Sequence, residues 1–316
     1  MKKTIAFILL CCVCAVFTTG CENTKLSRKE YTLATGSRSG VYYPIGETLA
    51  QILKEEFPDV TLKVIETDGS VENLQLIKAK KVDLALVQND IAHYAVNGEA
   101  MFAGEKITNV SGIATLFPEI VQFVVRKDSG INILEDLSGH KIAVGSKDSG
   151  TFYNAQQILS TAGVWNNISH QYINAAEAMQ ELHAGNIDGF VFTSGLPNPS
   201  IIELGKKTEI KLLPISGELT QKLINSYSFY YPSMVGMYQY PGQAEEFPAL
   251  EINAIVVSSE NLNENDQYLL TKHLFGKPNE LGKNHPRLSK MTKASLRHQL
   301  SVKLGSGAFR AHSEIK

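Results

Sequence analysis

Cysteine is scarce in this sequence and confined to the beginning of the chain. The four cysteines are Cys11, Cys12, Cys14 and Cys21, among 316 residues. If the chain is cut before Cys21 and this residue is lipidated, no thiol is left to form a disulfide, so stability must come from the burial of apolar side chains. A hydrophobic content of 43% in a chain of this length is enough for such a core.

An excess of either charge is missing as well. The whole chain has 30 basic and 32 acidic residues. Residues 1–20 hold two lysines and no acid, so the chain without them has 28 basic residues (30 minus 2) against 32 acidic ones, a formal charge of -4. Such a balance predicts neither a nucleic-acid-binding surface nor a basic patch that attracts membrane lipids.

The sequence also lacks the signatures of common catalytic, metal and cofactor sites. Its eight histidines are scattered, none forms an HExxH pair, and no His–Cys cluster is spaced to hold zinc. The GxSxG, GxGxxG and P-loop patterns are missing too. We therefore expect no enzymatic activity, no metal and no cofactor; a secreted hydrolase is the least favoured alternative.

The start of the chain has the pattern of a secretory signal. Two lysines precede an apolar run over residues 5–17, and Gly20 precedes Cys21. The run is shorter than the roughly 18 to 20 residues of a membrane-spanning helix. Residues 1–20 thus read as a signal peptide of the lipoprotein type, with Cys21 lipidated, for example by palmitate. Cleavage without lipidation is the alternative, because Thr18 stands where such signals usually have leucine. We predict an extracytoplasmic protein, in the periplasm or at the cell surface, anchored to a membrane by its lipid.

Strand-like and helix-like segments alternate along the rest of the chain. Short runs rich in branched apolar residues predict strands, here residues 31–35, 60–66, 82–87, 142–145, 170–173 and 188–192. Helical spacing of apolar residues follows most of them, starting near Pro44, Ser70, Thr151 and Ala175. This order predicts an α/β fold with a mainly parallel sheet covered by helices.

The elements fall into two series, which we expect to form two lobes. Residues 120–125 read as a strand that crosses from the first lobe to the second, and a return crossing is expected between residues 227 and 255. The first lobe then comprises residues 31–122 plus about 229–316, and the second residues 123–228. Two α/β lobes joined by paired extended crossovers can close on a ligand by hinge motion.

Two glycine-containing turns, residues 36–40 and 145–151, each lie between a strand and a helix. Backbone N–H groups and the dipole at a helix start favour an anion. Ligands of open α/β sheets bind at the carboxyl ends of the strands, where both turns lie. Ser149 and Thr151 could bind a carboxylate or cap the helix that follows. Gln88, at a strand end, could hydrogen-bond a ligand, and Asn73 could face either the cleft or solvent.

Seven short segments stand out, in order, after the signal: Thr35–Ser37, Gly40–Gly46, Gly69–Leu74, Leu86–Asp90, Ser149–Thr151, Gly195–Pro197 and Gly307–Arg310. Together they resemble the TAXI family, the extracytoplasmic solute-binding proteins of tripartite ATP-independent periplasmic (TRAP) transporters. The resemblance spans nearly the whole chain after residue 30. Lys147 and Asp148 replace the Pro-Gly that is usual in the family, and Arg38 stands where smaller residues are common.

The resemblance implies a two-lobed periplasmic-binding-protein-like fold of type II, with hinge-linked lobes and a central ligand cleft. It implies a small carboxylate ligand, such as glutamate, glutamine or a dicarboxylate, delivered to the membrane permease of a TRAP-type transporter. The residues that it places at the ligand are Ser37, Gly40, Tyr42, Ser70, Asn73, Gln88, Ser146, Ser149, Gly150 and Thr151. A receptor that presents its ligand to a membrane sensor kinase is the alternative function.

Overall fold

The computed structural model describes residues 24–315, so the predicted signal and the predicted lipid attachment at Cys21 lie outside the described residues. The strands are β1 (Glu30–Ala34), β2 (Thr61–Ile65), β3 (Leu84–Gln88), β4 (Val110–Arg126), β5 (Lys141–Ala143), β6 (Ser169–Gln171), β7 (Gly189–Ser194), β8 (Ile210–Leu213), β9 (Tyr231–Val235) and β10 (Phe247–Ser259). The α-helices are α1 (Tyr42–Glu56), α2 (Ser70–Lys78), α3 (Asn89–Asn97), α4 (Gly150–Thr161), α5 (Ala175–Ala184), α6 (Pro199–Gly205), α7 (Gly217–Ser226), α8 (Glu264–Phe275) and α9 (Ser306–Glu314).

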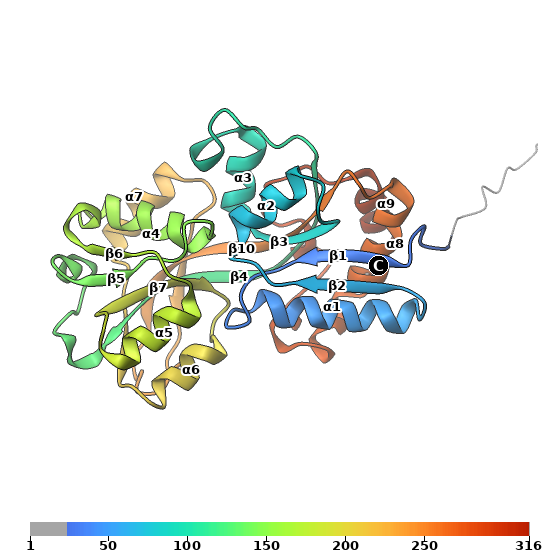
Figure 1. The fold of residues 1–316 in the computed structure, drawn as a ribbon. Helices are drawn as coiled ribbons and strands as arrows, with labels where there is room; N and C mark the ends of the chain where they lie inside the picture. The colour runs from blue at the N-terminus through green and yellow to red at the C-terminus, as the bar shows by residue number, and fades with distance from the viewer. Residues whose placement is uncertain (1–23, 316) are drawn as a thin grey trace, which may run out of the picture.

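All of these strands belong to one ten-stranded sheet with helices on both faces (Figure 1). Their order is β2-β1-β3-β10-β4-β7-β5-β6, while β8 pairs with β4 and β9 with β10. Within residues 24–315, no helix combines the length and the apolar character that crossing a membrane requires.

In the first half of the molecule, three strands lie side by side and run parallel. β1 pairs with β2 and with β3, so Leu33 lies between Val64 and Leu84. α1 covers one face of these strands with Ile45 and Leu49, which are one helical turn apart and fully or almost fully buried. α2 and α3 cover the opposite face (Figure 1).

The second half repeats this arrangement with β5, β6 and β7. β5 runs parallel to both of its neighbours. α4 buries Ile158 against one face, and α5 buries Leu182 against the other (Figure 1). Apolar side chains therefore cover both sides of the strands in each half, and on the side of α2, α3 and α4 one buried cluster continues from the first half into the second.

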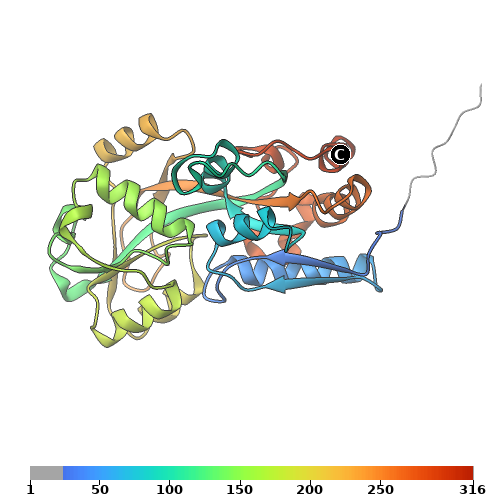
Figure 2. The ribbon, with the colours of Figure 1, turned by 45° about the horizontal axis from the view of Figure 1, so that its top comes forward.

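Two long antiparallel strands, β4 and β10, run through both halves. Ile120 of β4 pairs with Glu251 of β10 on one side and with Ser194 of β7 on the other. β10 in turn pairs with β3, where Ile255 lies opposite Val87. Both views show the two strands passing from one half to the other, and the chain returning through α8 and α9 to the end where the described residues begin (Figures 1 and 2).

The sheet is mixed, whereas the sequence predicts a mainly parallel one. Pairing is parallel among β1, β2 and β3 and among β5, β6 and β7, but β4 and β10 pair antiparallel with each other and with each of their neighbouring strands. The reason is that both crossing strands insert between the two parallel sets. The predicted crossing at residues 120–125 lies within β4, and the lobe boundaries themselves stay a prediction.

Candidate functional site

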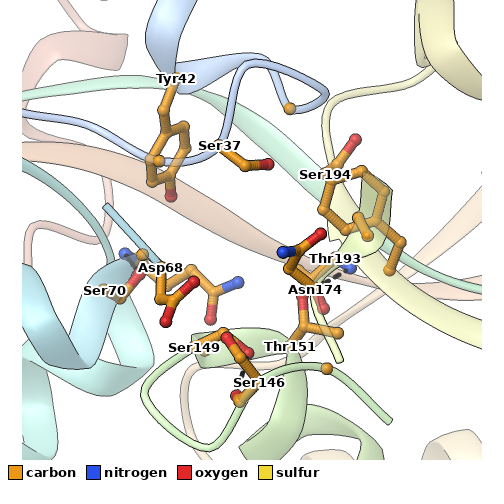
Figure 3. Close-up of a pocket in the computed structure, with 18 of the residues that line it drawn as sticks. Ser37, Tyr42, Asp68, Ser70, Ser146, Ser149, Thr151, Asn174, Thr193 and Ser194 are labelled. Atoms are coloured by element: carbon orange, nitrogen blue, oxygen red, sulfur yellow. Dashed lines mark hydrogen bonds between the residues drawn. The ribbon is translucent and has the colours of Figure 1, made fainter. Parts of the chain in front are cut away.

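A cavity lies where the two halves meet, at the carboxyl ends of their parallel strands (Figure 3). Its empty volume is about 630 Å³, open solvent at its mouth included. The turns that lead into α1, α2, α4 and α5 line it, together with residues of β3, β4 and β7. Both turns that the sequence singles out, residues 36–40 and 145–151, contribute to this lining.

Nine of the ten predicted ligand-binding residues line this one cavity. They are Ser37, Gly40, Tyr42, Ser70, Gln88, Ser146, Ser149, Gly150 and Thr151. In Figure 3, Ser37, Tyr42 and Ser70 come from the first half, and Ser146, Ser149 and Thr151 face them from the second. The structure thus brings these side chains together, and their binding of a ligand stays a prediction.

Asn73 is the exception, because its side chain lies within the first half rather than in the cavity. It is fully buried. Its Nδ2 donates to the carbonyl oxygens of Thr35 at 2.6 Å and Leu86 at 2.7 Å, and its Oδ1 accepts from the Thr67 hydroxyl at 2.7 Å. Asn73 therefore ties the ends of β1 and β3 to the turn before α2.

The start of α4 uses its serine as a helix cap. Ser149 Oγ accepts from the backbone N–H of Phe152 at 3.2 Å and donates to the Ser146 carbonyl at 2.7 Å. Thr151 Oγ1 accepts from the N–H of Thr193 in β7 at 3.1 Å, so its own proton is left to donate. The sequence leaves two roles open for these hydroxyls, carboxylate binding and helix capping, and the structure shows Ser149 as a cap.

The start of α2 contacts the second half directly. The backbone N–H groups of Val71 and Glu72 donate to the carbonyl oxygen of Asp148 at 3.2 and 3.3 Å. Gly150 lies so close to the side-chain amide of Gln88 that an added Cβ would overlap it. Gln88 Oε1 is buried at this contact without a hydrogen-bond partner within the described chain. The two halves therefore touch on this side of the cavity.

Polar residues that the sequence reasoning missed also line the cavity: Asp68, Glu119, Asn174, Thr193 and Ser194. No lysine, arginine or histidine is among the described residues that line it, so its only ionisable groups besides the Tyr42 phenol are two carboxyls. Arg38 instead pairs with Glu66 at 3.1 Å, on the exposed surface. A signal for Glu119 did exist, because it is the only acid within the largely apolar strand β4.

Glu119 is buried beside Tyr42, with an exposed fraction of 2%. The Tyr42 hydroxyl donates to Glu119 Oε2 at 2.6 Å. Burial raises the pKa of Glu119 to about 8, and the negative charge of Asp90 adds to this, while the Tyr42 hydrogen bond and Arg287 oppose it. The carboxyl of Glu119 is therefore mostly protonated at neutral pH.

Asp90, at the start of α3, joins the first half to the second. Asn154 of α4 donates from Nδ2 to Asp90 Oδ2 at 2.6 Å and to the Tyr230 hydroxyl at 2.9 Å. Burial raises the pKa of Asp90 to about 6. This network lies next to the cavity but does not line it.

Comparison with known proteins places the chain in a family. The model of the NMT1-like family matches residues 33–315, from within β1 to the residue after the end of α9. This chain belongs to the NMT1-like family. The match does not test the more specific resemblance to the TAXI family, which stays a prediction.

Solved structures with a similar fold cover most of this NMT1-like chain. One is the periplasmic aliphatic sulphonate binding protein SsuA from Escherichia coli, with 16% identity and a TM-score of 0.50 over 92% of this chain and 84% of that chain. The alkanesulfonate-binding protein SsuA from Xanthomonas axonopodis pv. citri, bound to MOPS, has 14% identity and a TM-score of 0.54 over 92% and 86%. A binding protein component of a phosphonate ABC transporter from Pseudomonas aeruginosa has 14% identity and a TM-score of 0.53 over 86% and 83%.

These structures confirm the predicted fold class of the NMT1-like protein. It is an α/β protein with the two-lobed, type II periplasmic-binding-protein fold. At such low identity they show the fold alone, so the ligand has to be argued from the cavity itself.

Among residues 24–315, no group of His, Cys, Asp or Glu is arranged to hold a metal ion.

Proposed function

We propose that this protein is an extracytoplasmic solute-binding protein that captures a small carboxylate and delivers it to the permease of a TRAP-type transporter. Glutamate, glutamine and dicarboxylates are the cargo classes. The observation that carries the proposal is that strand-to-helix turns of both halves face each other across one cavity.

The lining of the cavity suits a carboxylate held without a cationic side chain. α1, α4 and α5 all begin at its wall, so helix dipoles direct partial positive charge into it. Hydroxyl groups surround these helix starts, among them those of Ser37, Thr151 and Ser194. Hydrogen bonds from N–H and O–H groups to a carboxylate are charge-assisted, and they are roughly twice as strong as neutral ones.

We assign residues 31–122 plus about 229–316 to the first lobe and residues 123–228 to the second. β4 and β10 are then the hinge, because among the strands of residues 24–315 they are the two that connect the halves. Ligand bound between the lobes would favour a closed form that docks on the permease. The predicted lipid at Cys21 would keep the protein near that partner in the periplasm or at the cell surface.

The fold also supports a second partner, an ABC transporter. Solved structures that share the fold include components of such transporters, among them the phosphonate-binding one. The two functions differ in the energy source, since TRAP-type uptake uses an ion gradient and ABC-type uptake uses ATP. The sensor-kinase receptor would bind the same cargo and drive no uptake.

A thermal-unfolding screen tests the cargo. The purified protein would be heated with L-glutamate, L-glutamine, succinate or glutarate, and with ethanesulfonate and methylphosphonate as comparison anions. A ligand at a hundred times its dissociation constant stabilises by about 2.7 kcal/mol. We expect stabilisation by carboxylates only; a response confined to the sulfonate or phosphonate would contradict the proposal.

Reconstitution tests the partner. The protein would be added to vesicles that contain the candidate permease, with a labelled cargo identified by the screen. Uptake that needs an ion gradient and no ATP supports the TRAP assignment. Uptake that needs ATP supports the ABC alternative, and cargo binding without uptake by either kind of permease favours the receptor.

A further inference from the structure

We propose that Glu119 is a specificity-determining residue of the cavity, which binds the cargo as a neutral carboxyl and donates a hydrogen bond to a carboxylate oxygen of the ligand. The inference rests on the proposed function, since it assumes a carboxylate cargo. It adds that a proton shared between protein and ligand replaces the cationic side chain that the cavity lacks.

The geometry leaves one oxygen of Glu119 free for this role. Oε2 accepts from the Tyr42 hydroxyl at 2.6 Å, which fixes the carboxyl against α1. Oε1 has no hydrogen-bond partner within residues 24–315, and Glu119 is part of the cavity wall. Oε1 is not among the buried side-chain atoms that lack a partner, so it is open to the cavity, where a ligand acceptor can reach it.

The charges around the cavity decide the protonation state. An ionised Glu119 and a bound carboxylate would be like charges in one buried site, and no described lining residue is a lysine, arginine or histidine. Asp68, which also lines the cavity, is a further acid. A proton on Glu119 removes the repulsion and creates an O–H···O⁻ hydrogen bond, which is among the stronger kinds.

The ionisable groups that face Glu119 agree with this state. Tyr42 of α1 is itself a neutral phenol whose pKa is raised by burial and by Glu119. Asp90 of α3 is an acid, so its charge favours the neutral form of Glu119. The charge of Arg287, in the short 3-10 helix Pro286–Leu288, opposes it.

Arg287 is not available to the ligand in this structure. Its guanidinium donates to the carbonyl oxygens of Leu196 and Pro197, beyond the cavity wall. It does not line the cavity. The positive charge that acts on Glu119 therefore belongs to a side chain that joins the two halves.

Calorimetric binding at several pH values tests the inference, with glutarate and L-glutamate as the probes. Wild-type protein should bind glutarate with nearly constant affinity between about pH 6.5 and pH 7 and about tenfold more weakly at pH 9, because each pH unit above a pKa near 8 costs a factor of about ten. Glu119→Gln presents an N–H donor that cannot ionise. We expect it to bind glutarate about fivefold to tenfold more weakly at pH 6.5, but with no further loss up to pH 9.

The outcomes separate this inference from the proposed function. If Glu119→Gln loses affinity above pH 8 as the wild type does, or binds glutarate normally and loses only L-glutamate, Glu119 is not the neutral donor. The second result would instead show an ionised Glu119 that pairs with an ammonium group. If the wild type binds no carboxylate at any pH, the proposed function fails, and the inference fails with it.

Tyr42→Phe provides a second route if Glu119→Gln does not fold. It removes the hydroxyl that stabilises the ionised form of Glu119. The pH at which glutarate affinity begins to fall should then move upward. An unchanged midpoint in a folded Tyr42→Phe protein would overturn the inference.

Discussion

Gly150 lies directly against the side-chain amide of Gln88, with no room for a Cβ between them. The contact joins the start of α4 in one half to the end of β3 in the other. A Cβ at this position would have to displace the end of the Gln88 side chain, where the second half approaches the first at the cavity.

Gly150→Ala should weaken carboxylate binding, because the added Cβ has to displace the end of the Gln88 side chain at the cavity wall. Overpacking of a close contact costs typically about 1–3 kcal/mol, or roughly fivefold to more than a hundredfold in affinity. The unliganded protein should remain folded, because the contact lies between the halves rather than inside a core. Isothermal titration with glutarate or L-glutamate measures the loss. Gly217→Ala is the matched control, since Gly217 also starts a helix but has open space around it; equal affinities of the two variants would contradict the role of the contact.

Ser149→Ala should reduce both stability and binding. The substitution removes the cap of α4, which costs typically about 1 kcal/mol of unfolding free energy, and it frees the N–H of Phe152 at the cavity wall. Ser216→Ala removes the equivalent cap of α7, where Ser216 Oγ accepts from the N–H of Leu219, far from the lining residues. Urea unfolding should show similar losses for both variants. Only Ser149→Ala should weaken carboxylate binding, and equal affinities would show that Ser149 is a cap and nothing more.

Local signals explain why so much of the cavity could be predicted from the sequence. A glycine and a serine between a strand pattern and a helix pattern mark a turn at the carboxyl end of a strand, and such ends share one edge of a parallel set. The turns at Gly40 and Gly150 were found in this way. The paired crossovers expected at residues 120–125 and 227–255 predict that the two lobes close on a ligand, and the resemblance to a solute-binding family implies the same arrangement.

Long-range contacts explain what the sequence could not provide. Asn73 lies in the first turn of α2, at a position that looks solvent-accessible from the sequence, but the fold brings it to Thr35, directly after β1, and to Leu86 of β3. Likewise, nothing in the helix-start pattern shows that the amides of α2 are used by Asp148 of the other half. β4 and β10 pair antiparallel although they are more than a hundred residues apart in the sequence. No local pattern predicts that these two segments become neighbours.

The stability of the unliganded protein should fall as the pH rises from about 6 to about 8. In the folded protein Glu119 keeps its proton up to a pKa of about 8, whereas an unfolded glutamate has a pKa near 4.5. Between these values the unfolded chain releases a proton that the folded one retains, so a higher pH favours unfolding. The window above pH 6 avoids most of the titration of Asp90. The expected loss there is about 2 kcal/mol.

Urea unfolding of Glu119→Gln at the same pH values identifies the group responsible. The variant cannot titrate at this position, so its unfolding free energy should change much less between pH 6 and pH 8 than that of the wild type. Glu105→Gln is the control, because Glu105 is exposed and its pKa is lowered by Lys78, so it stays ionised throughout. A slope in Glu119→Gln as steep as that of the wild type would assign the pH dependence to another residue.

Arg287→Lys should weaken a second contact between the halves, the one that Arg287 makes with Leu196 and Pro197. The Arg287 guanidinium donates to two carbonyl oxygens, those of Leu196 and Pro197, and a lysine ammonium cannot reproduce this planar fork. Each hydrogen bond from a charged group is worth about 1.5–3 kcal/mol, so the loss of one should weaken glutarate binding by about tenfold or more. The effect should appear as faster dissociation, because the closed form is the one destabilised. Arg126→Lys, on an exposed pair with Asp128, is the matched control and should leave the dissociation rate unchanged. If stopped-flow dissociation is equally fast in the wild type and in Arg287→Lys, these carbonyl contacts do not hold the lobes closed.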